Sequence, residues 1–174
     1  YLGTGTTRTA DAAAITADSA IYANALDVGD GGRVILWSDE LTIFAGNIEA
    51  KGGAVAGDGG FIETSSKINL QAFGLGDASA ANGAAGAWLL DPTDVTIVNG
   101  AGATTGGAFS GGAPDVFTGS AATAQIFNDT IETALNGGTS VTIDTTSAVV
   151  GAQHGNITLQ TGANIAKTAG GDAT

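Results

Sequence analysis

The sequence contains no cysteine and no methionine, and it has only five basic residues. Without cysteine there is no disulfide, no thiolate nucleophile and no cysteine-ligated zinc. The absence of methionine leads us to expect that the chain is a segment of a longer protein. Because the net charge is −12 and five scattered cations cannot form a basic patch, nucleic acid is not expected as a partner.

Long hydrophobic runs are also missing, and aromatic residues are few. No stretch approaches the ~18 consecutive apolar residues that a spanning helix needs, so no membrane-spanning segment is expected. Aromatic residues make up 6% of the chain, whereas hydrophobic residues make up 43% and glycines number 29. This composition is not that of a disordered chain. It predicts a thin core built from small and branched side chains.

The abundant glycines recur at a fixed interval. GDGG begins at residue 29 and again at residue 57, and a degraded version, GAAG, begins at residue 83. After each cluster, apolar and polar residues alternate, which is the pattern of a strand with one buried face. Apolar residues of successive segments align in columns, namely Val34–Ile62–Trp88, Leu36–Thr64–Leu90, Leu41–Ile68–Val95, Ile15–Ile43–Leu70–Ile97 and Ile21–Ile48–Leu75.

Each repeat of about 27 residues therefore carries about three short strands separated by polar turns, with no helical crossover between them. Equivalent strands of successive coils then stack in parallel, and each apolar column points into a narrow interior. The pattern predicts an all-β fold, a right-handed parallel β-helix or solenoid. GDGG marks a corner of this coil, where glycine permits a sharp bend.

The repeat is interrupted once. Residues 99–140 begin with a glycine-rich stretch and continue with TAQIFNDTIETALNGG, whose apolar residues recur at helical spacing. We expect residues 1–98 to form β-helix coils and residues 99–140 to form an insertion with one short amphipathic helix packed on the solenoid wall. Residues 141–174 are expected to resume the coil.

The segments GDGGRVILWSDE, GDGGFIETSSK, WLLDPTDVTI and KTAGGDAT resemble those of filamentous-haemagglutinin-like large exoproteins, the passengers of two-partner secretion in Gram-negative bacteria. The resemblance covers essentially the whole chain. It implies a C-terminal-side β-helix segment of a secreted cell-surface fibre that serves adhesion, aggregation and biofilm formation. Implied partners are glycans, host or neighbouring cells, and copies of the protein in fibres. The parent chain is implied to leave through an outer-membrane transporter, although the family's secretion domain is not matched here.

Catalytic motifs are scarce. The single histidine, His154, has no second histidine for a metal site, and we expect no enzyme, no metal and no cofactor. The alternative is a carbohydrate-active β-helix enzyme, a polysaccharide lyase or glycosidase, because acids on stacked coils ~4.8 Å apart reach the spacing of glycosidase pairs. The candidate acids are Asp39, Glu40, Glu63, Asp91 and Asp94. We expect these acids to be solvated at the corners of the coil.

Aromatic side chains are the better candidates for binding. Strand alternation places three of them on the outside of the coil, next to aliphatic neighbours that point inward. They are Tyr22, Trp37 and Phe44. These side chains would form a strip for sugar stacking or partner contact, or they would pack beneath the 99–140 insertion.

Overall fold

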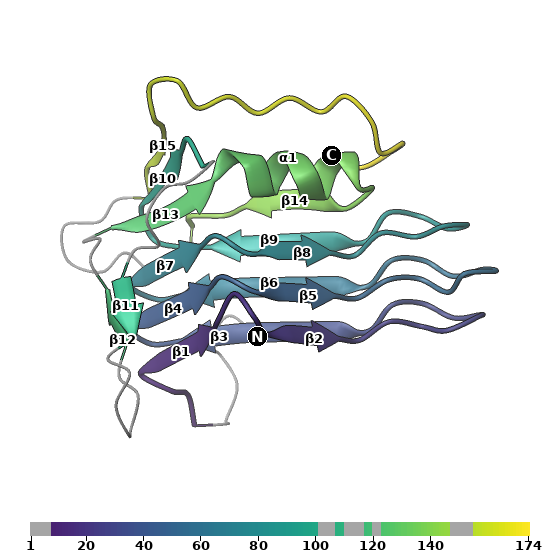
Figure 1. The fold of residues 1–174 in the computed structure, drawn as a ribbon, viewed down its shortest axis with the longest axis horizontal. Coiled ribbons are helices and arrows are strands. Elements are labelled where there is room, and N and C mark those ends of the chain that lie inside the picture. Colours follow the sequence, from purple (N-terminus) through teal and green to yellow (C-terminus); the bar gives the residue numbers. More distant parts are fainter. Residues whose placement is uncertain (1–7, 101–106, 110–116, 120–122, 147–154) are drawn as a thin grey trace.

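The chain folds as a right-handed parallel β-solenoid of about three turns with a single short helix, which confirms the predicted fold class (Figure 1). The computed structural model describes residues 8–100, 107–109, 117–119, 123–146 and 155–174. The coil length is about 28 residues. Arg33 pairs with Phe61, for example, 28 positions further along the chain.

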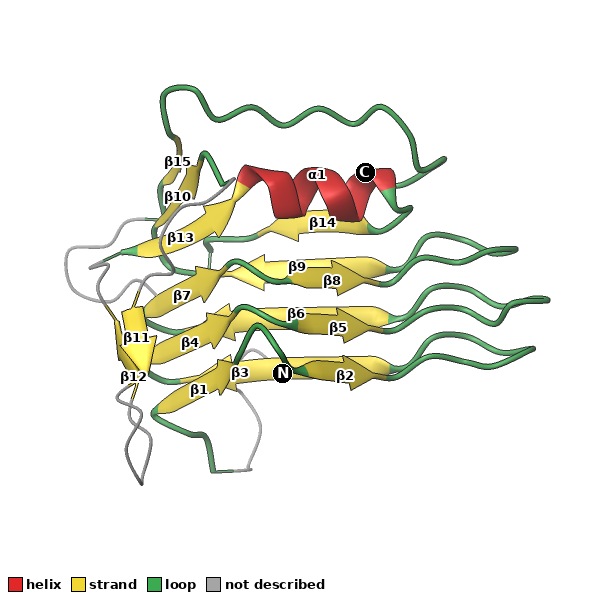
Figure 2. Ribbon diagram, viewed as in Figure 1, coloured by secondary structure: helices red, strands yellow, loops and turns green. Residues whose placement is uncertain are grey.

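Three parallel sheets form the walls of the solenoid (Figure 2). Sheet 1 contains, in spatial order, β1 (Ala12–Ile15), β4 (Leu41–Phe44), β7 (Asn69–Ala72), β13 (Ala124–Phe127), β10 (Val95–Val98) and β15 (Ile157–Leu159). Sheet 2 contains β14 (Ser140–Ile143), β9 (Ala87–Asp91), β6 (Phe61–Ser66) and β3 (Arg33–Ser38). Sheet 3 contains β2 (Ala20–Tyr22), β5 (Asn47–Glu49) and β8 (Leu75–Asp77). The remaining elements are the helix α1 (Asn128–Asn136) and an antiparallel hairpin of β11 (Gly107–Phe109) and β12 (Phe117–Gly119).

The predicted columns of sheet 2 are confirmed. Val34 pairs with Ile62, and Ile62 pairs with Trp88. The next inward column, Leu36–Thr64–Leu90, has the predicted register as well. The GDGG corner precedes β3 and β6 at the same distance, and this fixes where both strands begin.

The predicted columns of sheet 1 are wrong by one residue, and the predicted column of sheet 3 is wrong at its third member only. Ile43 pairs with Gln71 rather than Leu70, and Ile15 pairs with Phe44. In sheet 3, Ile21 pairs with Ile48 as predicted, but Ile48 pairs with Gly76 rather than with Leu75. The alignment in sheet 1 failed because it placed Ile68 in a strand, whereas this residue lies in the corner between β6 and β7 and is 38% exposed.

The core is organised around Trp88. Its ring lies edge-to-face with that of Phe44, at a centroid distance of 5.9 Å and an interplanar angle of 88°. Its Nε1 donates a hydrogen bond to the Thr64 hydroxyl at 3.0 Å. A Cβ on Gly76 would lie 2.6 Å from the indole ring, so the inward position of β8 has no side chain. The prediction that Phe44 points outward is wrong, because the shifted register of sheet 1 turns this ring into the core, where it is fully buried.

One strand of the solenoid is out of sequence order. β13 lies between β7 and β10, and it pairs with both in parallel. The segment that follows the glycine-rich stretch therefore occupies the rung above β7, and β10 is displaced by one rung. α1 then packs on β8 and β14, where a third strand of the rung would lie (Figure 1).

The two ends of the solenoid differ. At the C-terminal end, Ile131 and Leu135 of α1 join the core. The tail crosses over the helix and is held by Asn136, whose amide oxygen accepts hydrogen bonds from the Thr168 and Ala169 amides at 2.7 and 2.8 Å. At the N-terminal end, β1, β2 and β3 are the outermost strands of their sheets. The helix was predicted within the 99–140 segment, and its presence there is confirmed.

We predict that Gly76→Val destabilises the protein by about 1–3 kcal/mol, because the added methyl groups overlap the Trp88 ring. In a Trp88→Leu background the same substitution costs much less, since the smaller side chain leaves room. Urea unfolding of both single variants and the double variant measures this coupling. Additive losses would contradict the packing described for the core.

A cysteine pair tests the position of β13, because the chain has no cysteine of its own. Thr96 and Gln125 are register partners, so Thr96→Cys combined with Gln125→Cys should form a disulfide on mild oxidation. The control pair is Gln71→Cys with Thr96→Cys, which a regular coil would bring together and which β13 separates. A disulfide in the control pair, detected by mass spectrometry, would contradict the observed strand order.

Candidate functional site

Three stacked loops project from one edge of the solenoid (Figure 1). We call residues 24–32, 52–60 and 79–86 the loop ridge. The Asp30 carboxylate accepts a hydrogen bond from the Asp58 amide at 2.8 Å, and the Asp58 carboxylate accepts one from the Ala84 amide at 2.8 Å. Gly57 has a φ of 136°, which favours glycine. The aspartate of GDGG thus links one loop to the next, and the repeated motif has a structural role.

The loop ridge exposes large apolar side chains that the sequence analysis did not identify. Leu26 is 86% exposed, Val28 is 72% exposed and Val55 is 65% exposed. Tyr22, on the adjacent β2, is 69% exposed. Apolar side chains at such exposure on neighbouring loops are typical of a contact surface. Strand periodicity did not predict the exposure of these side chains, because loop residues do not alternate regularly between the inside and the outside of the coil.

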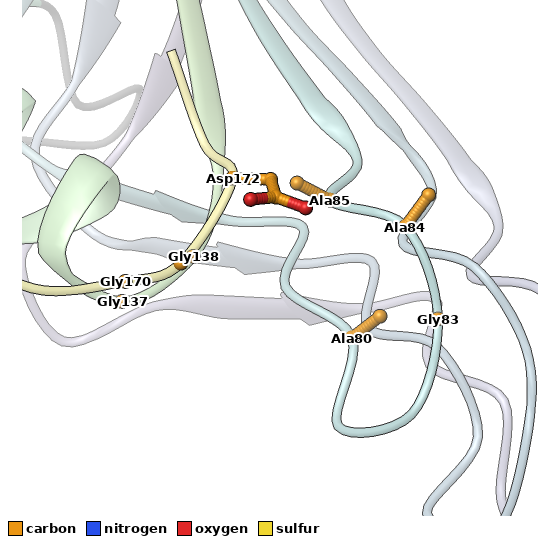
Figure 3. A pocket seen from close by; sticks show the side chains of 9 residues that line it. Ala80, Gly83, Ala84, Ala85, Gly137, Gly138, Gly170 and Asp172 are labelled. Carbon is orange, nitrogen blue, oxygen red and sulfur yellow. The ribbon is translucent and has the colours of Figure 1, made fainter.

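Two cavities border the loop ridge. One, of about 450 Å³, crosses all three loops and is lined by Asn24, Leu26, Lys51 and Ser79 among others. The other, of about 370 Å³, lies between the third loop and the turn that follows α1, and alanines, glycines and Asp172 line it (Figure 3). The lining of the first cavity combines polar groups with aliphatic side chains.

An ion network holds Lys51, one of the residues that line the first cavity. The Lys51 Nζ lies 3.2 Å from the Glu49 carboxylate and 3.0 Å from the Asp77 carboxylate. Asn24 donates to Glu49 at 2.8 Å and thereby joins the first coil to the second. Burial opposes the ionisation of Asp77, but hydrogen bonds from Ser79 and Lys51 outweigh it and hold the pKa of this carboxyl below its ordinary value.

The five candidate acids lie in different environments. The expectation that all of them are solvated at the corners of the coil is wrong for two. Glu63 is fully buried and Asp91 is 4% exposed, because both belong to the strands of sheet 2 rather than to its corners. Of the three remaining acids, Glu40 is exposed, and Asp39 and Asp94 are half-buried. The five acids do not line an open cleft together, since the two on sheet 2 are withdrawn from solvent.

The three candidate aromatic residues are not brought together into a strip. Tyr22 is exposed as expected, Trp37 is half-buried, and Phe44 is in the core. His154 lies outside the described residues. Within the described ranges, no group of three or more His, Asp or Glu side chains is placed to hold a metal ion.

In the part of the chain that the structure describes, no helix has the length and apolarity needed to cross a membrane. A scan against protein-family models finds no match, and a search of the curated proteins finds none either.

We predict that Asp77→Asn lowers the free energy of unfolding at pH 7 by about 1 kcal/mol, because it removes one carboxylate from the Lys51 network. A carboxyl whose pKa is depressed on folding stabilises the fold above its unfolded pKa of about 3.9, and this contribution disappears as the pH falls through the folded pKa. The deficit of the variant should therefore shrink below about pH 4. Denaturant unfolding at pH 7, 5 and 3 measures it.

The control is Asp18→Asn, at an exposed position in the turn between β1 and β2. An equal and pH-independent loss in both variants would show that the network contributes nothing specific.

Proposed function

We propose that the chain is a structural and adhesive segment of a secreted bacterial surface fibre, located outside a Gram-negative cell after export of its parent chain through an outer-membrane transporter. The rung-by-rung stacking of three parallel sheets supports this role, because each rung contacts only its neighbours and the result is a stiff spacer. The resemblance to filamentous-haemagglutinin-like exoproteins supports the location.

The observation that carries the adhesive part of the proposal is the loop ridge. Leu26, Val28 and Val55 are its most exposed apolar side chains, and the adjoining cavity adds the polar groups of Asn24 and Ser79. Such a surface suits the alternating apolar faces and hydroxyl groups of a glycan on a partner cell. Because the net charge is −12, a neutral or cationic glycan is favoured over an acidic one.

The enzymatic alternative has less support. A glycosidase needs two carboxyl groups that flank an accessible bond, yet Glu63 and Asp91 are withdrawn from solvent. A lyase acting on an acidic polymer needs cations near its substrate, and the cation that lines the first cavity, Lys51, is already engaged by two carboxylates.

The test is binding of the purified protein to a glycan array and to cultured cells. A triple variant, Leu26→Ser, Val28→Ser and Val55→Ser, should reduce binding at least about fivefold, because about 1 kcal/mol of apolar contact is lost. Its matched control is Ile157→Ser, Leu159→Ser and Ile165→Ser, which changes three exposed aliphatic residues outside the loop ridge.

Equal binding by wild type, triple variant and control would overturn the assignment of the loop ridge. Release of reducing ends or unsaturated sugars from a polysaccharide would instead favour the enzyme.

A further inference from the structure

We propose that the side-chain amide of Asn82 deamidates spontaneously in the folded protein, and that this modification loosens the third loop of the loop ridge from the second. Asn82 is exposed and lies in a bend in the middle of the third loop. The inference rests on the surroundings of its Asn–Gly step and holds whatever the loop ridge binds.

Deamidation at an Asn–Gly step needs no reagent other than water. The backbone nitrogen of the glycine bonds to the Cγ of the asparagine, the Cγ–Nδ2 bond breaks, and ammonia leaves with the proton that the backbone nitrogen loses. Water then opens the cyclic imide at either carbonyl, which yields aspartate or isoaspartate. Glycine favours this reaction because no Cβ obstructs its nitrogen and its backbone is conformationally permissive. The rate in a fold therefore depends on whether the glycine nitrogen is held by a hydrogen bond.

The chain has three Asn–Gly steps, and the fold treats them differently. They are Asn82–Gly83, Asn99–Gly100 and Asn136–Gly137. The Gly100 amide donates a buried hydrogen bond to the Asn128 side chain at 2.8 Å. The Gly137 amide donates to the Thr133 carbonyl at 2.9 Å, as part of the last turn of α1. In both of these steps the attacking nitrogen is engaged, so the fold protects the asparagine.

The step at Asn82 has no such protection. The Gly83 amide makes no hydrogen bond to any residue in the described ranges, whereas the next amide, that of Ala84, is held by the Asp58 carboxylate. Gly83 also lines the second cavity, which gives its backbone open space (Figure 3). A Cβ at this position would overlap the Gly57 carbonyl of the loop below. The stacking of the loops thus requires glycine after Asn82, and the reactive step comes with it.

Deamidation at this position removes a link between two loops. The Asn82 Nδ2 donates a hydrogen bond at 2.9 Å to the carbonyl of Ala54 in the second loop. A carboxylate cannot donate this bond and repels the carbonyl oxygen, and isoaspartate also lengthens the backbone by one carbon. Ala54 and Ala80 line the first cavity from the second and third loops. The modification therefore adds a negative charge and changes the contact between the loops that border this cavity.

Mass spectrometry of the folded chain, incubated in mildly alkaline buffer, tests the site. Chymotrypsin cleaves after large apolar residues and places the three Asn–Gly steps on separate peptides, because Trp88, Phe109 and Leu135 lie between or beside them. The Asn82 peptide should convert at least about tenfold faster than the other two. In urea, where the fold no longer protects any of them, all three should convert at similar rates.

Asn82→Gln is the control for the reaction, because the longer side chain closes its ring far more slowly. This variant should show no conversion at residue 82 and unchanged rates at the other two steps. Equal rates at the three steps of the folded chain would overturn the proposal. An Asn82 peptide that persists in the folded chain while its counterpart in urea converts would overturn it too.

Hydrogen exchange tests the consequence. Asn82→Asp reproduces the aspartate product, and Asn99→Asp makes the same chemical change outside the loop ridge. The amides of Ala84 and Gly59 form hydrogen bonds between the third and second loops. They should exchange at least about fivefold faster in Asn82→Asp than in the wild type or in Asn99→Asp. Equal exchange of these amides in all three proteins would contradict the loosening of the loop.

Discussion

The structure depends on the stacking of inward side chains from successive coils. Parallel hydrogen bonding sets the spacing between rungs, so each inward residue must fit directly against the residues above and below it. Trp88 shows how strict this fit is. Its ring packs edge-to-face against Phe44, and a Cβ at the facing position of β8, Gly76, would clash with the ring. A thin core of this kind can hold one large ring because the neighbouring strand β8 has a glycine, and therefore no side chain, at the facing position.

The same stacking determines what the surface can do. Because every coil returns to the same corner, the loops between sheets 3 and 2 lie one above another, and the aspartates of GDGG hold them in place. Residues such as Leu26 and Val55 are thereby presented at high exposure from a rigid wall. At the C-terminal end of the described coils, α1 packs its apolar side chains into the core. The loop ridge is thus a consequence of the coil.

The sequence predicted the fold class and the columns of sheet 2, because GDGG anchors the start of β3 and β6. It failed by one residue in sheet 1, because Ile68 is apolar but lies in a corner, and this error turned Phe44 outward. The position of β13 could not be predicted, because the sequence after a glycine-rich stretch does not indicate which strand the next strand will pair with. The burial of Glu63 was missed because a carboxylate in a strand is expected to face water.

The most direct test of the stacked core is nuclear magnetic resonance of the chain labelled at isoleucine methyl groups and tryptophan. The account predicts strong contacts from Ile62 methyl groups to the Trp88 indole, and amide-to-Hα contacts characteristic of parallel strands between β3, β6 and β9. Absence of these contacts, or Hα-to-Hα contacts of antiparallel pairing between the same strands, would contradict it.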